Sequence, residues 1–170
     1  MRRNSLTWGK LIVFAIAVLL VATCIAAALI YNQVLNDKTK GFAAAEKTAI
    51  RKAGLSEVIQ VDRFDSKKSY YIVQGKDKKG KGKFVFIPMA KKEKPAIIDD
   101  KDIYAEGKVK EIWRESCSSC TFVKTSAAMI ANEPLWEITY KDGSGHYGFA
   151  YFSMKDGTAT EQFRLSNTIR

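Results

Sequence analysis

Residues 70–89 read YYIVQGKDKKGKGKFVFIPM, and residues 135–154 read LWEITYKDGSGHYGFAYFSM. At an offset of 65 residues and with no gap, the stretches share a Lys-Asp pair (Lys76-Asp77 over Lys141-Asp142), one glycine, one phenylalanine and one methionine. An internal repeat fixes the architecture, because each copy is one supersecondary unit. The sequence therefore predicts two copies of one small unit.

Each copy reads as a helix followed by strands. Apolar residues recur at helical spacing over 42–53 and again over 103–116, where Val109, Ile112 and Trp113 share a face. Clusters rich in β-branched and aromatic residues then predict strands at 58–64, 69–74, 83–87 and 96–98, and at 121–130, 135–140, 147–153 and 158–165. The fold class is therefore α+β, with one helix on an antiparallel meander in each unit. Units of about 60 residues are marginal alone, so we expect the two to pack together.

The N-terminal region is different. Leu11 to Ile30 form a run of 20 residues in which Thr23 is the only polar side chain and no residue is charged. Such a helix reaches about 30 Å, the thickness of the hydrocarbon core of a bilayer. The run predicts a transmembrane helix. A cleaved signal peptide and a lipoprotein modified at Cys24 are the alternatives.

Charge sets the expected orientation and the expected partners. Arg2, Arg3 and Lys10 precede the apolar run, and positive flanks stay in the cytoplasm, so the rest of the chain lies outside. We expect a cytoplasmic tail (1–10), a transmembrane helix (11–30), a first helix-plus-meander unit (31–98) and a second one (99–170). The net charge is +10, and removing those three residues leaves +7 on 31–170. The lipid bilayer and anionic wall polymers suit a basic external domain, whereas nucleic acid is not an expected partner there.

The sequence offers few candidate residues for catalysis or metal binding. His146 is the only histidine and falls in a predicted hairpin, so we expect no catalytic, cofactor-binding or metal-binding residues. Asp99, Asp100 and Asp102 lack the calcium-loop pattern and are interpreted as helix-start residues. Cys117 and Cys120 form a CxxC that closes a helix, whereas a redox site opens one. A local structural disulfide and two free thiols both remain open for this pair.

Aromatic residues on the predicted strands are the candidates for binding. Alternation sends about half of the side chains of a strand to the core and leaves the others on the opposite face. The candidate partner surface consists of Tyr71, Trp136, Tyr140, Tyr147 and Tyr151. The alternative is that the helices and the neighbouring repeat cover these aromatics.

The order of anchor, helix, meander, helix and meander resembles the YpmB/TseB-like family of Gram-positive bacteria, which is related in fold to PepSY domains. The resemblance is carried by residues 42–46 (FAAAE), 70–77 (YYIVQGKD) and 135–142 (LWEITYKD), and it covers about residues 8–166. It implies two tandem PepSY/cystatin-like units and a non-enzymatic regulator of cell wall elongation. Such proteins are thought to act beside a class B penicillin-binding protein, a peptidoglycan synthase. The Cys117/Cys120 pair departs from the family pattern.

Two other functions fit the same features. One is a PepSY-like inhibitor or chaperone of a secreted peptidase. The other is a protein that binds anionic wall polymers through its basic surface.

Overall fold

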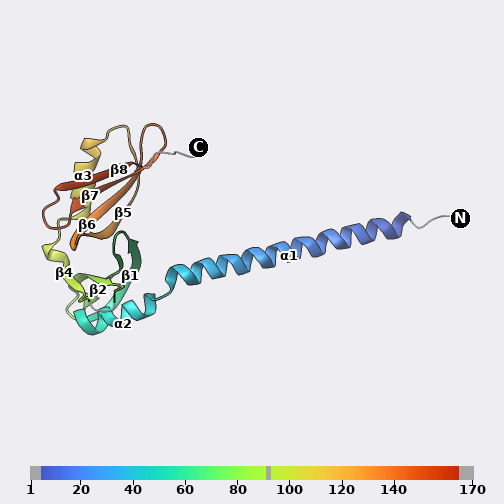
Figure 1. Cartoon of the computed structure of the whole chain (residues 1–170), viewed down its shortest axis with the longest axis horizontal. Helices are drawn as coiled ribbons and strands as arrows, with labels where there is room; N and C mark the ends of the chain where they lie inside the picture. Colours follow the sequence, from blue (N-terminus) through green and yellow to red (C-terminus); the bar gives the residue numbers. More distant parts are fainter. Residues whose placement is uncertain (1–4, 91–92, 165–170) are drawn as a thin grey trace. The chain divides into compact units, whose positions relative to one another are not determined.

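A computed structural model of the chain describes residues 5–90 and 93–164 (Figure 1). The chain divides into two compact parts, residues 1–40 and residues 41–170. We call residues 41–170 the body. It holds both copies of the repeat.

Residues 1–40 contain one long helix, α1 (Ser5–Thr39). Its apolar stretch, Trp8–Leu35, spans 28 residues; the mean hydropathy over 18 consecutive residues within it is 2.9, and none of those residues is buried inside the protein. The hydroxyl of Thr23 donates a hydrogen bond of 2.8 Å to the carbonyl of Leu20, so the one polar side chain of the run is satisfied within the helix. An uncovered apolar helix of this length at the N-terminus fits a single-pass membrane anchor or a signal sequence.

The first helix–meander unit of the body comprises α2 (Phe42–Ala53), β1 (Leu55–Asp65), β2 (Ser69–Asp77), β3 (Gly82–Pro88) and β4 (Ala96–Asp99). The strands form one antiparallel sheet in the order β1-β2-β3-β4. Helix α2 ends where the sequence predicts, because Gly54 takes the left-handed conformation with φ 69° and its N–H closes the last turn onto Ile50.

Small side chains join α2 to its sheet. Ala49, Val73 and Val85 are completely buried, and Ala45, Ala53 and Leu55 complete this cluster. Alternation along β2 sends Val73 toward α2 and the neighbouring Ile72 to the opposite face of the sheet. Both faces of the first sheet are therefore apolar.

The second unit repeats the arrangement with a 3-10 turn, η1 (Asp100–Asp102), then α3 (Glu106–Ser116), β5 (Thr121–Ile130), β6 (Glu133–Lys141), β7 (Tyr147–Ser153) and β8 (Ala159–Arg164). Its strands form a second antiparallel sheet in the order β5-β6-β7-β8. The sequence prediction placed the start of α3 too early. Ile103 is extended and residues 104–105 are not helical, and the N–H of Tyr104 donates to the carbonyl of Met154 at 2.6 Å instead of starting a helix. Ala105 precedes α3 without a side-chain cap, so the interpretation of Asp99, Asp100 and Asp102 as residues that start this helix is corrected.

Matching turns show the repeat in atomic detail. The Oδ1 atom of Asp77 accepts the backbone N–H groups of Lys79 and Lys81 at 2.8 and 3.0 Å. Its counterpart Asp142 accepts those of Ser144 and His146 at 2.9 and 3.0 Å. Each turn also contains a glycine with positive φ, 75° at residue 80 and 82° at residue 145. The repeated Lys-Asp pairs therefore start the same hairpin turn twice.

One large core joins the two units. The face of the first sheet that turns away from α2 contacts the second unit, and Phe84 packs edge-on against Trp136 with ring centroids 5.6 Å apart. The hydroxyl of Tyr70 also donates to Oδ1 of Asn132 at 3.1 Å. The expected packing of one unit on the other is confirmed. The members of this core are Tyr70, Ile72, Phe84, Phe86, Val109, Trp113, Met129, Trp136, Ile138, Tyr140, Ala150, Phe152 and Met154.

Candidate interaction surface

Three of the five aromatics expected on a partner surface lie in the interior. Trp136 is 6% exposed, and its indole N–H donates to the carbonyl of Tyr104 at 2.9 Å. Tyr140 is 3% exposed and packs on Trp113 with ring centroids 5.6 Å apart. Tyr151 is 8% exposed, and its hydroxyl donates to Oε2 of Glu137 at 2.7 Å. Because the neighbouring unit, α3 and the strands already cover these rings, the expectation that they face a partner is corrected.

The other two aromatics reach the surface to different degrees. Tyr71 is half-buried and packs edge-on against Phe42, with ring centroids 6.0 Å apart. Tyr147 is 45% exposed, and the ammonium of Lys141 lies 5.0 Å from its ring centroid. Of the five candidates, Tyr147 alone offers a largely exposed ring.

The edge strands carry exposed apolar residues that the sequence analysis did not single out. The pairing of β1 with β2 shifts register between Val58 and Gln60, and the pairing of β5 with β6 shifts between Phe122 and Lys124. The residues inside these two shifts are Ile59, 51% exposed, and Val123, 42% exposed. A bulge re-aims a side chain out of the regular alternation. Each unit therefore presents one β-branched apolar side chain at a bulge in its first strand.

Alternation counting missed these two residues because a bulge breaks the period of two. The signal available in the sequence was the run of apolar neighbours Val58 and Ile59, since consecutive residues of a regular strand cannot both face the core. Ile59 and Val123 are the candidate interaction positions that the structure supports.

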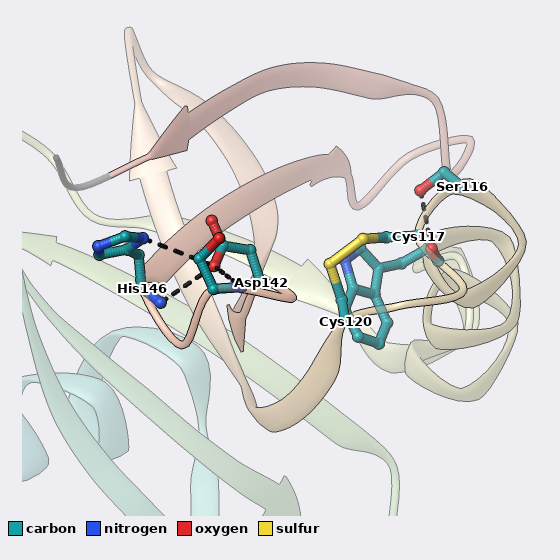
Figure 2. The surroundings of a disulfide bond; sticks show 7 residues. Ser116, Cys117, Cys120, Asp142 and His146 are labelled. Atoms are coloured by element: carbon teal, nitrogen blue, oxygen red, sulfur yellow. Dashed lines mark hydrogen bonds and ion pairs between the residues drawn. A yellow bond between two sulfur atoms is a disulfide. The ribbon is translucent and has the colours of Figure 1, made fainter.

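A disulfide bond joins Cys117 and Cys120 directly after α3 (Figure 2). The backbone N–H of Cys117 donates to the carbonyl of Trp113, the hydroxyl of Ser116 donates to the same carbonyl at 2.7 Å, and Cys120 packs against the large core. The bond therefore lies between the end of a helix and the start of β5. It holds a tight connection in place, and it lies outside any helix N-terminus that would activate a thiol.

The hairpin after β6 uses its polar groups for structure. Oδ1 of Asp142 caps the turn by accepting two backbone N–H groups. Nδ1 of His146 lies 3.7 Å from the same oxygen (Figure 2). Within residues 5–90 and 93–164, no group of three or more His, Cys, Asp or Glu residues is arranged to hold a metal ion. His146 and Asp142 therefore serve the structure of the hairpin turn.

Comparisons with known proteins connect this fold to a family. A family model described as the cell wall elongation regulator TseB-like domain matches residues 44–88. A protein of Bacillus subtilis (strain 168) named probable cell wall elongation regulator TseB is 31% identical over 150 residues, which cover 87% of this chain and 93% of the relative. The solved structure of the YpmB protein from Bacillus subtilis superposes with a TM-score of 0.68 at 30% identity and covers 74% of this chain and 98% of that one.

The match to the named relative includes most of both chains, so the similarity is not confined to residues 44–88. The chain belongs to the TseB-like family of cell wall elongation regulators.

Proposed function

We propose that this protein is a single-pass membrane protein that regulates cell wall elongation outside the cytoplasm by contacting another protein. The observation that carries the proposal is the similarity over 87% of the chain to a protein named as a probable cell wall elongation regulator. In this proposal the chain works as a regulator without catalysing a reaction.

The proposed topology follows the charge and the length of the N-terminal helix. Residues 1–10 form a cytoplasmic tail, 11–30 cross the bilayer, and the rest of the chain, with both helix–meander units, lies outside. The positive residues Arg2, Arg3 and Lys10 support this orientation. Tethering confines the body to a thin layer above the membrane, which raises its effective concentration for a second membrane protein. A weak interface can then suffice.

The proposed partner is a class B penicillin-binding protein or another membrane protein of the elongation machinery. The bulge residues Ile59 and Val123 support a contact of this kind, because they are large, apolar, exposed and placed on the first strand of each unit. Edge strands normally avoid such side chains, since they favour association with other chains. The two residues are therefore the positions at which we place the partner.

Site-specific photocrosslinking in living cells tests the contact. A photoreactive amino acid is introduced at Ile59 or Val123 of the full-length chain, and captured proteins are identified by mass spectrometry. Matched controls carry the same amino acid at Lys78 and Glu115, which are also exposed. We expect capture of a peptidoglycan synthase from the two bulge positions and none from the controls.

Other outcomes would refute the proposal in distinct ways. Capture of a secreted peptidase would favour the inhibitor or chaperone function. Equal capture from all four positions would show that Ile59 and Val123 do not define the contact. Binding of the protein to purified anionic wall polymer, abolished at high salt and with no protein captured, would favour the polymer-binding function.

A further inference from the structure

A cleft of about 110 Å³ opens between the two helix–meander units. The first unit lines it from the sheet face that turns away from α2, through β1, β2 and β3. The second unit lines it through the first residue of α3 and through β5 and β6. Its apolar floor includes Phe84 and Trp136, whose rings are in edge-to-face contact. A volume of this size holds several water-sized groups in a line, since one water needs about 10–15 Å³.

The charge of the cleft opposes that of the chain. Asp62 and Glu106 both line it, and no lysine, arginine or histidine does, although the whole chain carries a net charge of +10. Neither carboxylate forms an ion pair with any residue in 5–90 or 93–164. Glu106 alone would be explained by its place in the first turn of α3, where a negative charge stabilises a helix. Asp62 lies on β1, away from any helix N-terminus.

We propose that this cleft binds the primary ammonium group of a lysine side chain from an extended polypeptide segment. Asp62 and Glu106 supply the negative charge that an ammonium requires, and Phe84 and Trp136 accommodate its methylene chain. Two carboxylates with no third ligand do not make a metal site, in agreement with the absence of any metal-holding group among residues 5–90 and 93–164.

The amides of the cleft suit the backbone of a peptide ligand. Gln60 and Gln74 line it on neighbouring strands, and Nε2 of Gln60 donates to Oδ2 of Asp62 at 2.5 Å. A glutamine amide has two N–H groups and a carbonyl, so this bond leaves capacity to match the N–H and C=O of a peptide backbone. The inference is independent of the partner named above, because neither Ile59 nor Val123 lines the cleft.

A titration followed by NMR tests the site in the full chain held in detergent micelles. The probe is Nα-acetyl-lysine N-methylamide, and the reporter is the indole N–H of Trp136, which is hydrogen-bonded to Tyr104 inside the body. We expect a saturable shift of this signal and of the amide signals of residues 125–127. The norleucine analogue, which lacks the ammonium, should cause no such shift. Butylamine, which lacks the peptide groups, should bind more weakly.

A double variant and its matched control complete the test. Asp62→Asn with Glu106→Gln should weaken binding of the probe about tenfold or more, because both charge-assisted contacts are lost. Glu57→Gln with Glu115→Gln removes the same charge from exposed positions on the same strand and the same helix, outside the cleft, and should leave binding unchanged. Thermal unfolding of each variant checks that the fold is retained.

Three results would overturn the proposal. They are an equal shift with the norleucine analogue, an equal loss of binding in the two double variants, and no saturable shift with the lysine probe. Equal affinity for butylamine and the lysine probe would overturn the assignment of the ligand as a peptide.

Discussion

The two helix–meander units share one topology but pack their helices differently. Helix α2 meets its sheet through Ala45, Ala49 and Ala53, so the helix backbone lies close to Val73 and Val85. Helix α3 meets its sheet through Val109 and Trp113, and the indole of Trp113 reaches the large aromatic core. The first unit is held by close approach of small groups, whereas the second is held by the bulk of one side chain. The first therefore tolerates no added volume, and the second tolerates no loss of it.

The largest effect should come from removing bulk in the second unit. Trp113→Ala deletes a side chain that is 2% exposed and contacts Phe122 and Tyr140. We expect a loss of about 3–5 kcal/mol in the free energy of unfolding, because the large cavity cannot collapse. Urea unfolding of the detergent-solubilised chain, followed by near-ultraviolet circular dichroism, measures it. A loss below about 1 kcal/mol would contradict the comparison, because such a loss is typical of a surface position.

The opposite change tests the first unit. Ala49→Leu adds volume where α2 lies against the sheet, at a side chain that is completely buried. We expect a loss of about 1–3 kcal/mol from overpacking. Ala43→Leu, on the exposed side of the same helix, is the control and should change stability by less than about 0.5 kcal/mol. Equal effects of the two substitutions in urea unfolding would show that α2 does not lie against its sheet as described.

The hairpins at the start of each meander also differ. Residues 66–68 join β1 to β2, whereas the two residues Ala131 and Asn132 join β5 to β6 with φ values of 51° and 65°. An alanine in the left-handed conformation costs about 1–2 kcal/mol. Glycine avoids this cost, but the greater flexibility of glycine in the unfolded chain offsets about 0.5–1 kcal/mol of the gain. We expect Ala131→Gly to stabilise the body by up to about 1 kcal/mol in the same unfolding assay.

The neighbouring residue sharpens that prediction. Asn132→Gly should stabilise less than Ala131→Gly or destabilise the body, because it removes the acceptor for the hydroxyl of Tyr70 in the other unit. If the two glycine variants behave alike, this hydrogen bond between the units contributes nothing measurable.

The smallest effect concerns the repeated turn. The backbone N–H of Lys81, and then that of Lys79, hold the pKa of Asp77 below the ordinary value of an aspartate. A carboxyl with a lowered folded-state pKa contributes stability above its unfolded pKa, and this contribution is lost as the pH falls through the folded value. We expect Asp77→Asn to remove this part of the acid dependence of unfolding.

A carbon-detected NMR titration of the Asp77 carboxyl measures the pKa directly. A midpoint at or above the ordinary value for aspartate would contradict the prediction, since it would mean that the two turn N–H groups do not favour the charged form.

Much of this architecture could be predicted from the sequence. The repeat, the helix over 42–53 and the strands over 121–130 and 147–153 were located because periodicity and turn residues agree there. Bulges were not, because Ile59 and Val123 break the alternation on which strand prediction depends. Trp136, Tyr140 and Tyr151 were predicted on a partner surface but are buried, because the sequence does not say which face of each sheet meets the other unit. The cleft could not be predicted either, because its lining residues come from six elements that only tertiary packing brings together.

The oxidation state of Cys117 and Cys120, which form a disulfide bond in the structure, indicates on which side of the membrane the body folded. Cytosolic reductants keep thiols reduced, whereas the space outside the membrane lets a disulfide persist. Cells are quenched with acid, the protein is denatured, and a mass-shifting maleimide then counts the thiols that remain. A single modified cysteine, Cys24, would mark a chain whose C-terminal part had been exported, and three modified cysteines would mark one that had stayed inside. The number of modified cysteines thus shows on which side of the membrane the C-terminal part lies, without any fused tag.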